Sequence, residues 1–191
     1  MQIHGVLIGI VSDLEDPERI GRVKVTYPTL NDQESDWIRL IAAGAGKDRG
    51  LFFRPEKGDE VIVVFEQGDP LRAYVLGGVW SGEDPPPKDD GDAKANNWRF
   101  VRSRSGHVIK LDDTEGAELV EIVDKDGQRR VVLDSANKKI QVICQQGDVE
   151  VTAGAGTVKV EATTIEIKAT GNLTIEAGGP LKLKGATVDI N

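Results

Sequence analysis

Cysteine, aromatic side chains and long apolar runs are all scarce in this sequence of 191 residues. The one cysteine, Cys144, excludes a disulfide within the chain and suits a reducing compartment of synthesis, so we expect it to be a small core residue. No run approaches the ~20 apolar residues that a membrane-spanning helix needs. Residues 1–11 have neither a basic region nor a small-residue cleavage site, so we expect no signal peptide and synthesis in the cytoplasm.

Helical periodicity is absent as well. No stretch of ten or more residues places apolar side chains at i, i+3, i+4 and i+7. Instead, 22 glycines separate short runs rich in valine and isoleucine, which is typical of an all-β protein. The net charge of −8 argues against a general binder of nucleic acid or anionic membranes, because such partners require a positive surface.

The first segment, 1–80, alternates β-type runs with turn residues. The breaks contain Asp16-Pro17, Lys57-Gly-Asp and Gly68-Asp-Pro, which supply or tolerate the backbone angles of turns. Short strands at this density predict a small closed barrel of the OB type. The expected strands are Gly5–Val11, Gly21–Tyr27, Trp37–Ala42, Glu60–Phe65 and Arg72–Val79.

The second segment, 81–97, is rich in proline and acidic residues and has no apolar cluster. It predicts a linker, and Pro85 to Pro87 should make part of it stiff and extended.

The third segment, 98–191, becomes a repeat from Asp148 onward. Six short cores alternate apolar and polar residues and begin seven to nine residues apart, separated by Ala, Gly, Thr and Asn. Strict alternation puts one face of each core in the interior and one in water, which is the signature of a β-solenoid. The cores are Val149-Glu-Val-Thr, Val158-Lys-Val-Glu, Ile165-Glu-Ile-Lys, Leu173-Thr-Ile-Glu, Leu181-Lys-Leu-Lys and Val188-Asp-Ile-Asn.

Six cores are too few for one chain, because each triangular coil uses about three strands and two coils enclose little interior. We therefore predict a homotrimer, an intertwined triple-stranded β-helix in which each chain contributes strands in turn to every face of a prism and closure removes free edges. The predicted trimer core consists of Val149, Val151, Val158, Val160, Ile165, Ile167, Leu173, Ile175, Leu181 and Leu183, and continues to Val188 and Ile190.

Residues 98–146 show the same alternation with longer turns. We interpret these runs as wider strands of the same prism, which gives a needle roughly 50 to 55 Å long at ~4.8 Å per strand. The runs are Trp98–Arg102, His107–Leu111, Leu119–Ile122, Arg130–Leu133 and Ile140–Cys144.

The order and spacing of many short motifs resemble the phage baseplate assembly protein V and VgrG-type spike proteins over almost the whole chain. The resemblance rests on Gly9-Ile-Val-Ser-Asp, Gly21-Arg-Val-Lys-Val, Pro55-Glu-Lys-Gly-Asp-Glu-Val, Gly68-Asp-Pro, Tyr74-Val-Leu-Gly, Arg104-Ser-Gly-His, Leu111-Asp-Asp-Thr and Asp124-Lys-Asp-Gly.

This resemblance implies an OB-fold collar seated on a hub, followed by a trimeric β-helical spike that contacts and pierces a target membrane only when a sheath contracts. The large hub region of VgrG proteins does not precede the barrel, so we expect a separate hub protein at the OB end. The protein would be assembled into a phage virion or a phage-tail-like particle. The sequence does not distinguish between a phage, a secretion system and a free injection particle as the parent assembly, nor does it show whether the assembly is released from the cell.

Some spikes of this family hold iron at the tip in a His-x-His arrangement, but the two histidines here, His4 and His107, lie far from the end. We expect no metal site and no cofactor. The chain ends in a blunt edge, and we expect a separate PAAR-like tip protein to bind there, on Val188, Asp189, Ile190 and Asn191.

Catalysis and nucleic-acid binding are both disfavoured. The carboxylate pairs Asp112-Asp113 and Asp89-Asp90 suggest solvated turns rather than glycan chemistry. Tyr27, Trp37 and Phe52-Phe53 are expected to pack in the barrel or an interface rather than stack on bases. The alternative function is a trimeric β-solenoid tail-fibre enzyme or adhesin that acts on polysaccharide, although the outward repeat positions lack aromatic residues.

Overall fold

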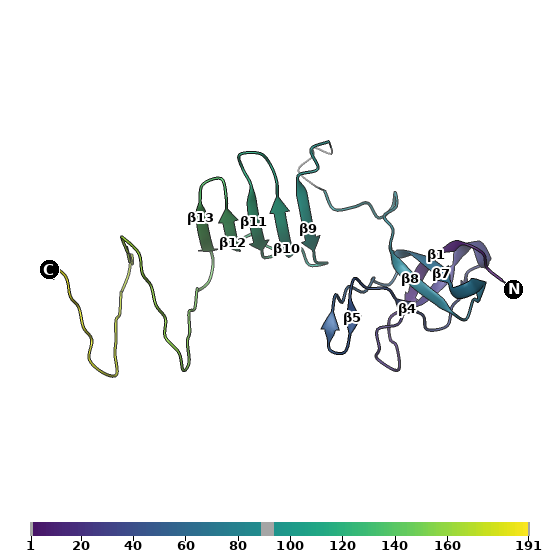
Figure 1. Ribbon diagram of the computed structural model, residues 1–191, viewed down its shortest axis with the longest axis horizontal. Helices are drawn as coiled ribbons and strands as arrows, with labels where there is room; N and C mark the ends of the chain where they lie inside the picture. The colour runs from purple at the N-terminus through teal and green to yellow at the C-terminus, as the bar shows by residue number, and fades with distance from the viewer. Residues whose placement is uncertain (1, 89–93, 191) are drawn as a thin grey trace.

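The computed structural model describes residues 2–88 and 94–190. It is all-β, with a barrel near the N-terminus, a separate sheet beyond the linker and an extended zigzag toward the C-terminus (Figure 1). In the described ranges, no helix is both long enough and apolar enough to cross a membrane.

The barrel is built on a six-stranded sheet in the order β3-β2-β1-β7-β8-β4. All its neighbours are antiparallel except β4 and β8. An isolated bridge closes the sheet between Val23, just before β2, and Ile38, just before β4. This closure leaves few free strand edges, as expected for an OB-type barrel. The strands are β1 (Val6–Asp13), β2 (Lys24–Tyr27), β3 (Gln33–Glu34), β4 (Arg39–Leu40), β7 (Glu60–Phe65) and β8 (Ala73–Gly78).

The barrel core is made almost entirely of small β-branched residues. Gly9 lies in its centre, where an added Cβ would meet a Val25 methyl at 3.0 Å and a Val63 methyl at 3.2 Å. The core therefore leaves no room for a larger residue on that part of β1. Its buried members are Val11, Val23, Val25, Tyr27, Ile38, Val61, Val63, Ala73 and Val75.

The predicted barrel strands all appear, with shifted ends, and the expected run 37–42 is reduced to β4 and the bridge at Ile38. Three two-residue strands were not predicted: β3, and the hairpin of β5 (Ala45–Gly46) and β6 (Arg49–Gly50). Two single-turn 3-10 helices, η1 (Pro28–Leu30) and η2 (Glu66–Gly68), complete the barrel.

The second sheet is an antiparallel meander in the order β13-β12-β11-β10-β9. Consecutive strands pair with each other because tight turns reverse the chain. In one of these, the Asp124 carboxylate accepts the Arg129 N–H at 3.1 Å, and Gly127 has a φ of +70°. The strands are β9 (Trp98–Arg102), β10 (Val108–Asp112), β11 (Leu119–Val123), β12 (Arg129–Asp134) and β13 (Lys139–Cys144).

This meander corrects one expectation. The chain was predicted to pass to a new prism face with every strand, and for β9 to β13 that prediction is wrong, because the five strands lie side by side in one sheet of one chain.

Residues 145–190, which hold the six repeat cores except for Asn191, form no strand within the single chain. Every one of them is exposed, and the segment runs as open zigzags away from β13 (Figure 1). In the predicted linker 81–97, residues 81–88 and 94–97 also form no strand. Residues 89–93, which include the Asp89-Asp90 pair, lie outside the described residues.

Candidate assembly surfaces

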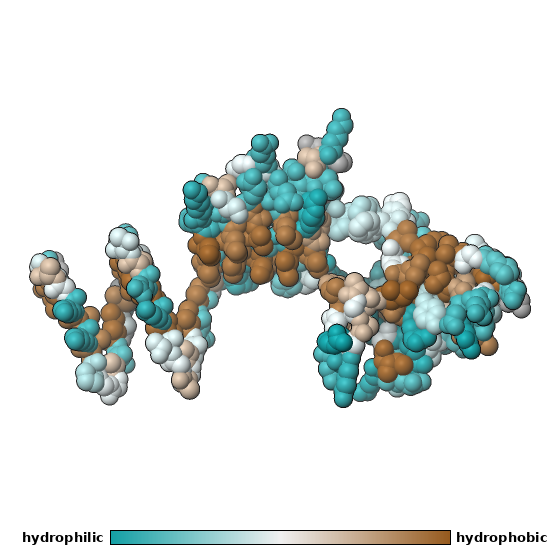
Figure 2. Space-filling model, viewed as in Figure 1, coloured by the Kyte–Doolittle hydropathy of each residue, from teal (hydrophilic) through white to brown (hydrophobic). Residues whose placement is uncertain are grey.

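One face of the β9–β13 sheet is almost entirely aliphatic and open. Cross-strand register arranges its side chains in two rows that run across the strands: Leu111, Val120, Leu133 and Ile140 in one, and Val101, Ile109, Ile122, Val131 and Val142 in the other. We call these residues the apolar sheet face. Apart from Val131, they are 36% to 74% exposed. Figure 2 shows the resulting hydrophobic band along the sheet.

The opposite face is mixed, with paired charged side chains among apolar ones such as Val123 and Val132. Lys110 lies 4.2 Å from the Trp98 ring centre, 3.4 Å from the Glu121 carboxylate and 3.5 Å from that of Asp112. Arg130 pairs with Glu121 at 3.7 Å. Charges that neutralise each other across strands suit a face that stays in water, whereas the aliphatic face leaves large apolar surface exposed.

Charged side chains border the apolar sheet face without entering it. Arg99 donates to the Asn96 carbonyl at 3.0 Å and to the Asp113 carboxylate at 3.1 Å. Arg129 pairs with Asp124 and donates to the Gln146 carbonyl at 3.1 Å. Both arginines are held at the borders by these partners. The surface between the borders consists of the two apolar rows and is therefore two side chains wide.

The Asp112-Asp113 pair is divided between two structural contacts. Burial raises the pKa of Asp112, but hydrogen bonds from Thr114 and the nearby Lys110 outweigh it and lower the pKa overall. Asp113 pairs with Arg99. The two carboxylates therefore hold the turn after β10 through separate contacts. The Asp113 side chain is 65% exposed, as a solvated turn predicts, whereas that of Asp112 is only 11% exposed.

The predicted trimer-core residues do not meet within one chain. The ten residues from Val149 to Leu183 in that set are 53% to 73% exposed. Each repeat core carries two apolar side chains two residues apart, so the cores match the two-row width of the apolar sheet face.

The predicted tip site lies at the free end of the zigzag. Val188 and Ile190 are 53% and 89% exposed, Asp189 is exposed too, and Asn191 lies outside the described residues.

The barrel carries a second apolar surface that the sequence did not reveal. Ile41, Leu51, Phe52 and Phe53, on both sides of the β5–β6 hairpin, are each more than half exposed, as is the neighbouring Ile20. They border a groove of about 550 Å³. Phe52-Phe53 was expected to pack in the barrel or an interface, and within this chain it does not pack in the barrel core.

A buried carboxylate fixes the loop beside this groove. Asp16, 7% exposed, accepts the N–H groups of Glu18, Ile20 and Arg22 at 3.0 to 3.2 Å and the Arg22 guanidinium at 2.7 Å. The Arg22 side chain, opposed by burial and aided by the backbone donors, holds the pKa of Asp16 well below its usual range. The role is structural, because these contacts occupy both carboxylate oxygens.

Several basic side chains of the barrel are paired with neighbouring groups. Arg22 pairs with Asp16, Lys24 with Glu34 at 2.9 Å, and Arg39 donates to the Tyr74 hydroxyl at 2.7 Å. The part of the chain that the structure describes contains no cluster of three His, Cys, Asp or Glu side chains that could hold a metal. His107 accepts the Lys125 N–H through Nδ1 at 3.2 Å.

Comparison with known proteins identifies the barrel. Residues 7–80 match the family described as the type VI secretion system/phage-baseplate injector OB domain. The chain is 31% identical over 134 residues to the type VI secretion system spike protein VgrG1a of Pseudomonas aeruginosa, covering 64% of this chain and 21% of that protein. It is 34% identical over 112 residues to VgrG1b of the same species, covering 53% of this chain and 15% of the relative.

A further relative is named for a toxin. The actin cross-linking toxin VgrG1 of Vibrio cholerae is 28% identical over 131 residues, which cover 62% of this chain and 12% of the toxin. The matched region thus spans about a fifth or less of each of these relatives.

Proposed function

We propose, from the premise that this chain is a phage-baseplate and VgrG-like protein, that it is the structural central spike of a contractile injection machine. Three copies join their β9–β13 sheets and repeat segments into a needle, with the OB barrels as a collar. The needle pierces a target envelope when a sheath contracts, and it contacts the target membrane only then.

The open apolar sheet face is the observation that carries this proposal. Burying an aliphatic side chain contributes about 1.5 to 3 kcal/mol, and these side chains are roughly half exposed in one chain, so each has about 1 kcal/mol to gain. A soluble protein seldom leaves so large a contiguous apolar surface in water. The opposite face, where Lys110 and Glu121 are paired among partly buried apolar side chains, is suited to the outside of the assembly.

Three copies fit the width of this surface. Two faces packed as a sandwich would leave its long sides open to water, whereas three faces, each two side chains wide, enclose a triangular interior. The repeat cores in 148–190 supply the same two apolar side chains but no backbone partners within the chain. Unpaired backbone N–H and C=O groups are costly when buried, so these cores require strands from other chains.

The first part of the needle then differs from the rest in how it is built. Each chain forms one whole face with β9 to β13, and only beyond Cys144 do the chains pass from face to face. The two apolar rows continue through both parts, so one interior runs along the whole needle.

The two ends of the needle meet different partners in this proposal. A separate hub protein binds the barrel end, and a PAAR-like tip protein caps the exposed apolar side chains of Val188 and Ile190. The toxin's activity is not carried over to this chain, because the match covers 12% of that protein, and we propose no enzymatic activity. Synthesis and assembly take place in the cytoplasm.

Electron cryomicroscopy of the purified protein tests the proposal. We expect threefold class averages with a collar and a rod roughly 50 to 55 Å long, at ~4.8 Å per stacked strand. Single barrels joined to unordered tails would contradict it.

A further inference from the structure

We propose that residues 41–54 form an arm that holds neighbouring copies together in the collar. The inference rests on the trimer proposed above and adds a second contact between copies, outside the needle. Its contact residues are Ile41, Leu51, Phe52 and Phe53, with Ile20 beside them.

The arm presents aromatic surface that its own chain does not cover. Phe52 is 77% exposed and Phe53 65%, although aromatic residues make up only 5% of this chain. One edge of the Phe52 ring lies beside Gly21 of its own barrel, where an added Cβ would be 3.3 Å from it. Exposed adjacent aromatic side chains beside a groove are typical of the centre of a protein interface.

The arm is preformed rather than a loose loop. At its start the Ile41 N–H donates to the Val75 carbonyl of β8 at 2.9 Å, and at its end the Arg54 guanidinium donates to the Leu14 carbonyl at 2.6 Å. Between these points, Gly50 has a φ of +136°, and a Cβ there would be 2.2 Å from the Gly44 carbonyl oxygen. Only glycine allows this close crossing, which sets the position of the hairpin.

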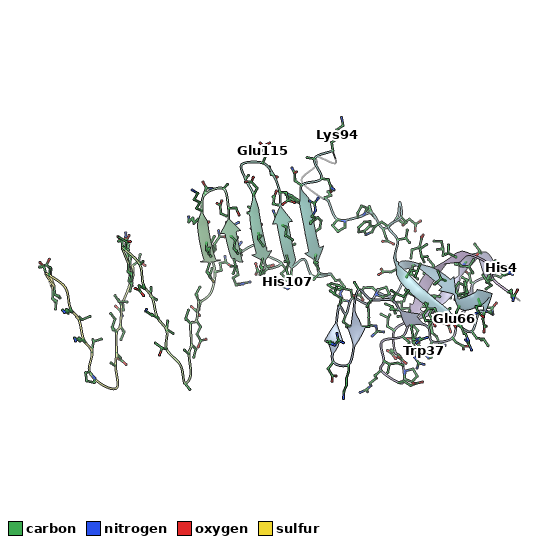
Figure 3. The ribbon with its side chains drawn as sticks, viewed as in Figure 1. His4, Trp37, Glu66, Lys94, His107 and Glu115 are labelled. Carbon is green, nitrogen blue, oxygen red and sulfur yellow. The ribbon has the colours of Figure 1, made fainter. Side chains whose placement is uncertain are left out.

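The arm lies at the end of the barrel that faces the needle. Figure 3 shows His107, at the near end of the sheet, close to the hairpin, whereas His4 and Glu66 lie on the far side of the barrel. An ion pair of 2.9 Å between Arg104 and Glu56 ties the turn before β10 to the segment just after the arm. In Figure 2, hydrophobic surface lies both along the sheet and on the side of the barrel that faces it.

This placement favours a second copy as the occupant over the hub. The hub is expected at the other end of the barrel, and the apolar sheet faces of three copies converge on one axis next to the arm. Threefold symmetry repeats the arm around that axis, so an arm that reaches sideways meets its neighbour. The apolar surface of the needle would then continue into the collar without a break.

Photocrosslinking tests this contact in the full chain. Benzoylphenylalanine replaces Phe53 in one variant and Leu71 in the control. Leu71 is a suitable control because it is exposed too, at 75%, but lies away from the arm. It is close in sequence to Gly68, whose carbonyl accepts the Ile3 N–H. The mass of each variant is measured first, before irradiation. We expect trimers in both, with covalent links between copies only from position 53.

The outcomes separate the arm from the needle. A trimer whose position 53 forms no link between copies, or no more than position 71, would overturn the arm contact and leave the needle standing. A monomer would overturn both proposals.

Trypsin provides a second measurement that does not depend on crosslinking, since Lys47 and Arg49 lie at the tip of the arm. With Phe52→Ser and Phe53→Ser together, we expect the trimer to persist and cleavage there to become roughly tenfold faster, because local opening controls proteolysis. Leu71→Ser should leave the rate unchanged. An unchanged rate in the double variant would contradict the arm contact.

Discussion

Replacing Ile122 with aspartate places a carboxylate at the centre of the apolar sheet face. Ile122 lies on β11, the middle strand of the five, and pairs with Ile109 and Val131 on either side. In one chain it is 51% exposed, so the isolated sheet should tolerate the change. In the trimer, three carboxylates would meet in a dry interior.

The size of the effect follows from burial. Each copy loses roughly 1 kcal/mol of apolar burial. Each buried, unpaired carboxylate costs several kcal/mol more. Over three copies the loss exceeds roughly 10 kcal/mol, which is more than seven orders of magnitude in the association constant at about 1.4 kcal/mol per tenfold.

Light scattering coupled to size exclusion gives the readout, with far-UV circular dichroism to check that the sheet persists. Gln141→Asp is the matched control, because it adds the same charge to the same sheet on the opposite face, opposite Val132. We expect Ile122→Asp to dissociate or misassemble and Gln141→Asp to stay trimeric. A trimer of Ile122→Asp as stable as the wild type would refute the reasoning.

Three further predictions follow from other parts of the chain. Cys144, which pairs with Arg129 at the border of the apolar sheet face, should react with a maleimide probe much more slowly in the native assembly than in urea; equal rates would contradict its enclosure. Deletion of 188–191 should abolish capture of a PAAR-like tip protein while the trimer mass is retained, and unimpaired capture would exclude this tip site. Asp16→Asn should lower the melting temperature of the barrel by removing the ion pair with Arg22. Because the folded pKa of Asp16 is lowered, its contribution to stability is present above its ordinary value of 3.8 and is lost as the pH falls below that value. The difference between wild type and variant should therefore shrink in strong acid, and a constant difference would argue against the ion pair.

Much of the fold follows from local pattern. Alternation of apolar and polar residues, bounded by turn residues such as Asp16-Pro17, located the main barrel strands and all five strands of the sheet. The resemblance to phage-baseplate and VgrG-type proteins was confirmed by the family match over residues 7–80 and by the similarity to VgrG1a.

Other features were out of reach because they depend on contacts rather than pattern. Alternation shows which face of a strand is apolar but not which strand lies beside it, so the meander of β9 to β13 was missed. Two-residue strands such as β5 and β6 have no alternation to detect. The identity of Phe52 and Phe53 as apolar residues could not show whether they pack inside the barrel or project from it.

The mass of the purified native protein in solution tests the central claim most directly. A species of three times 20.7 kDa that survives strong heating or detergent is what an intertwined needle predicts. A well-folded monomer of 20.7 kDa would contradict the trimer, and with it both the needle and the proposed piercing role.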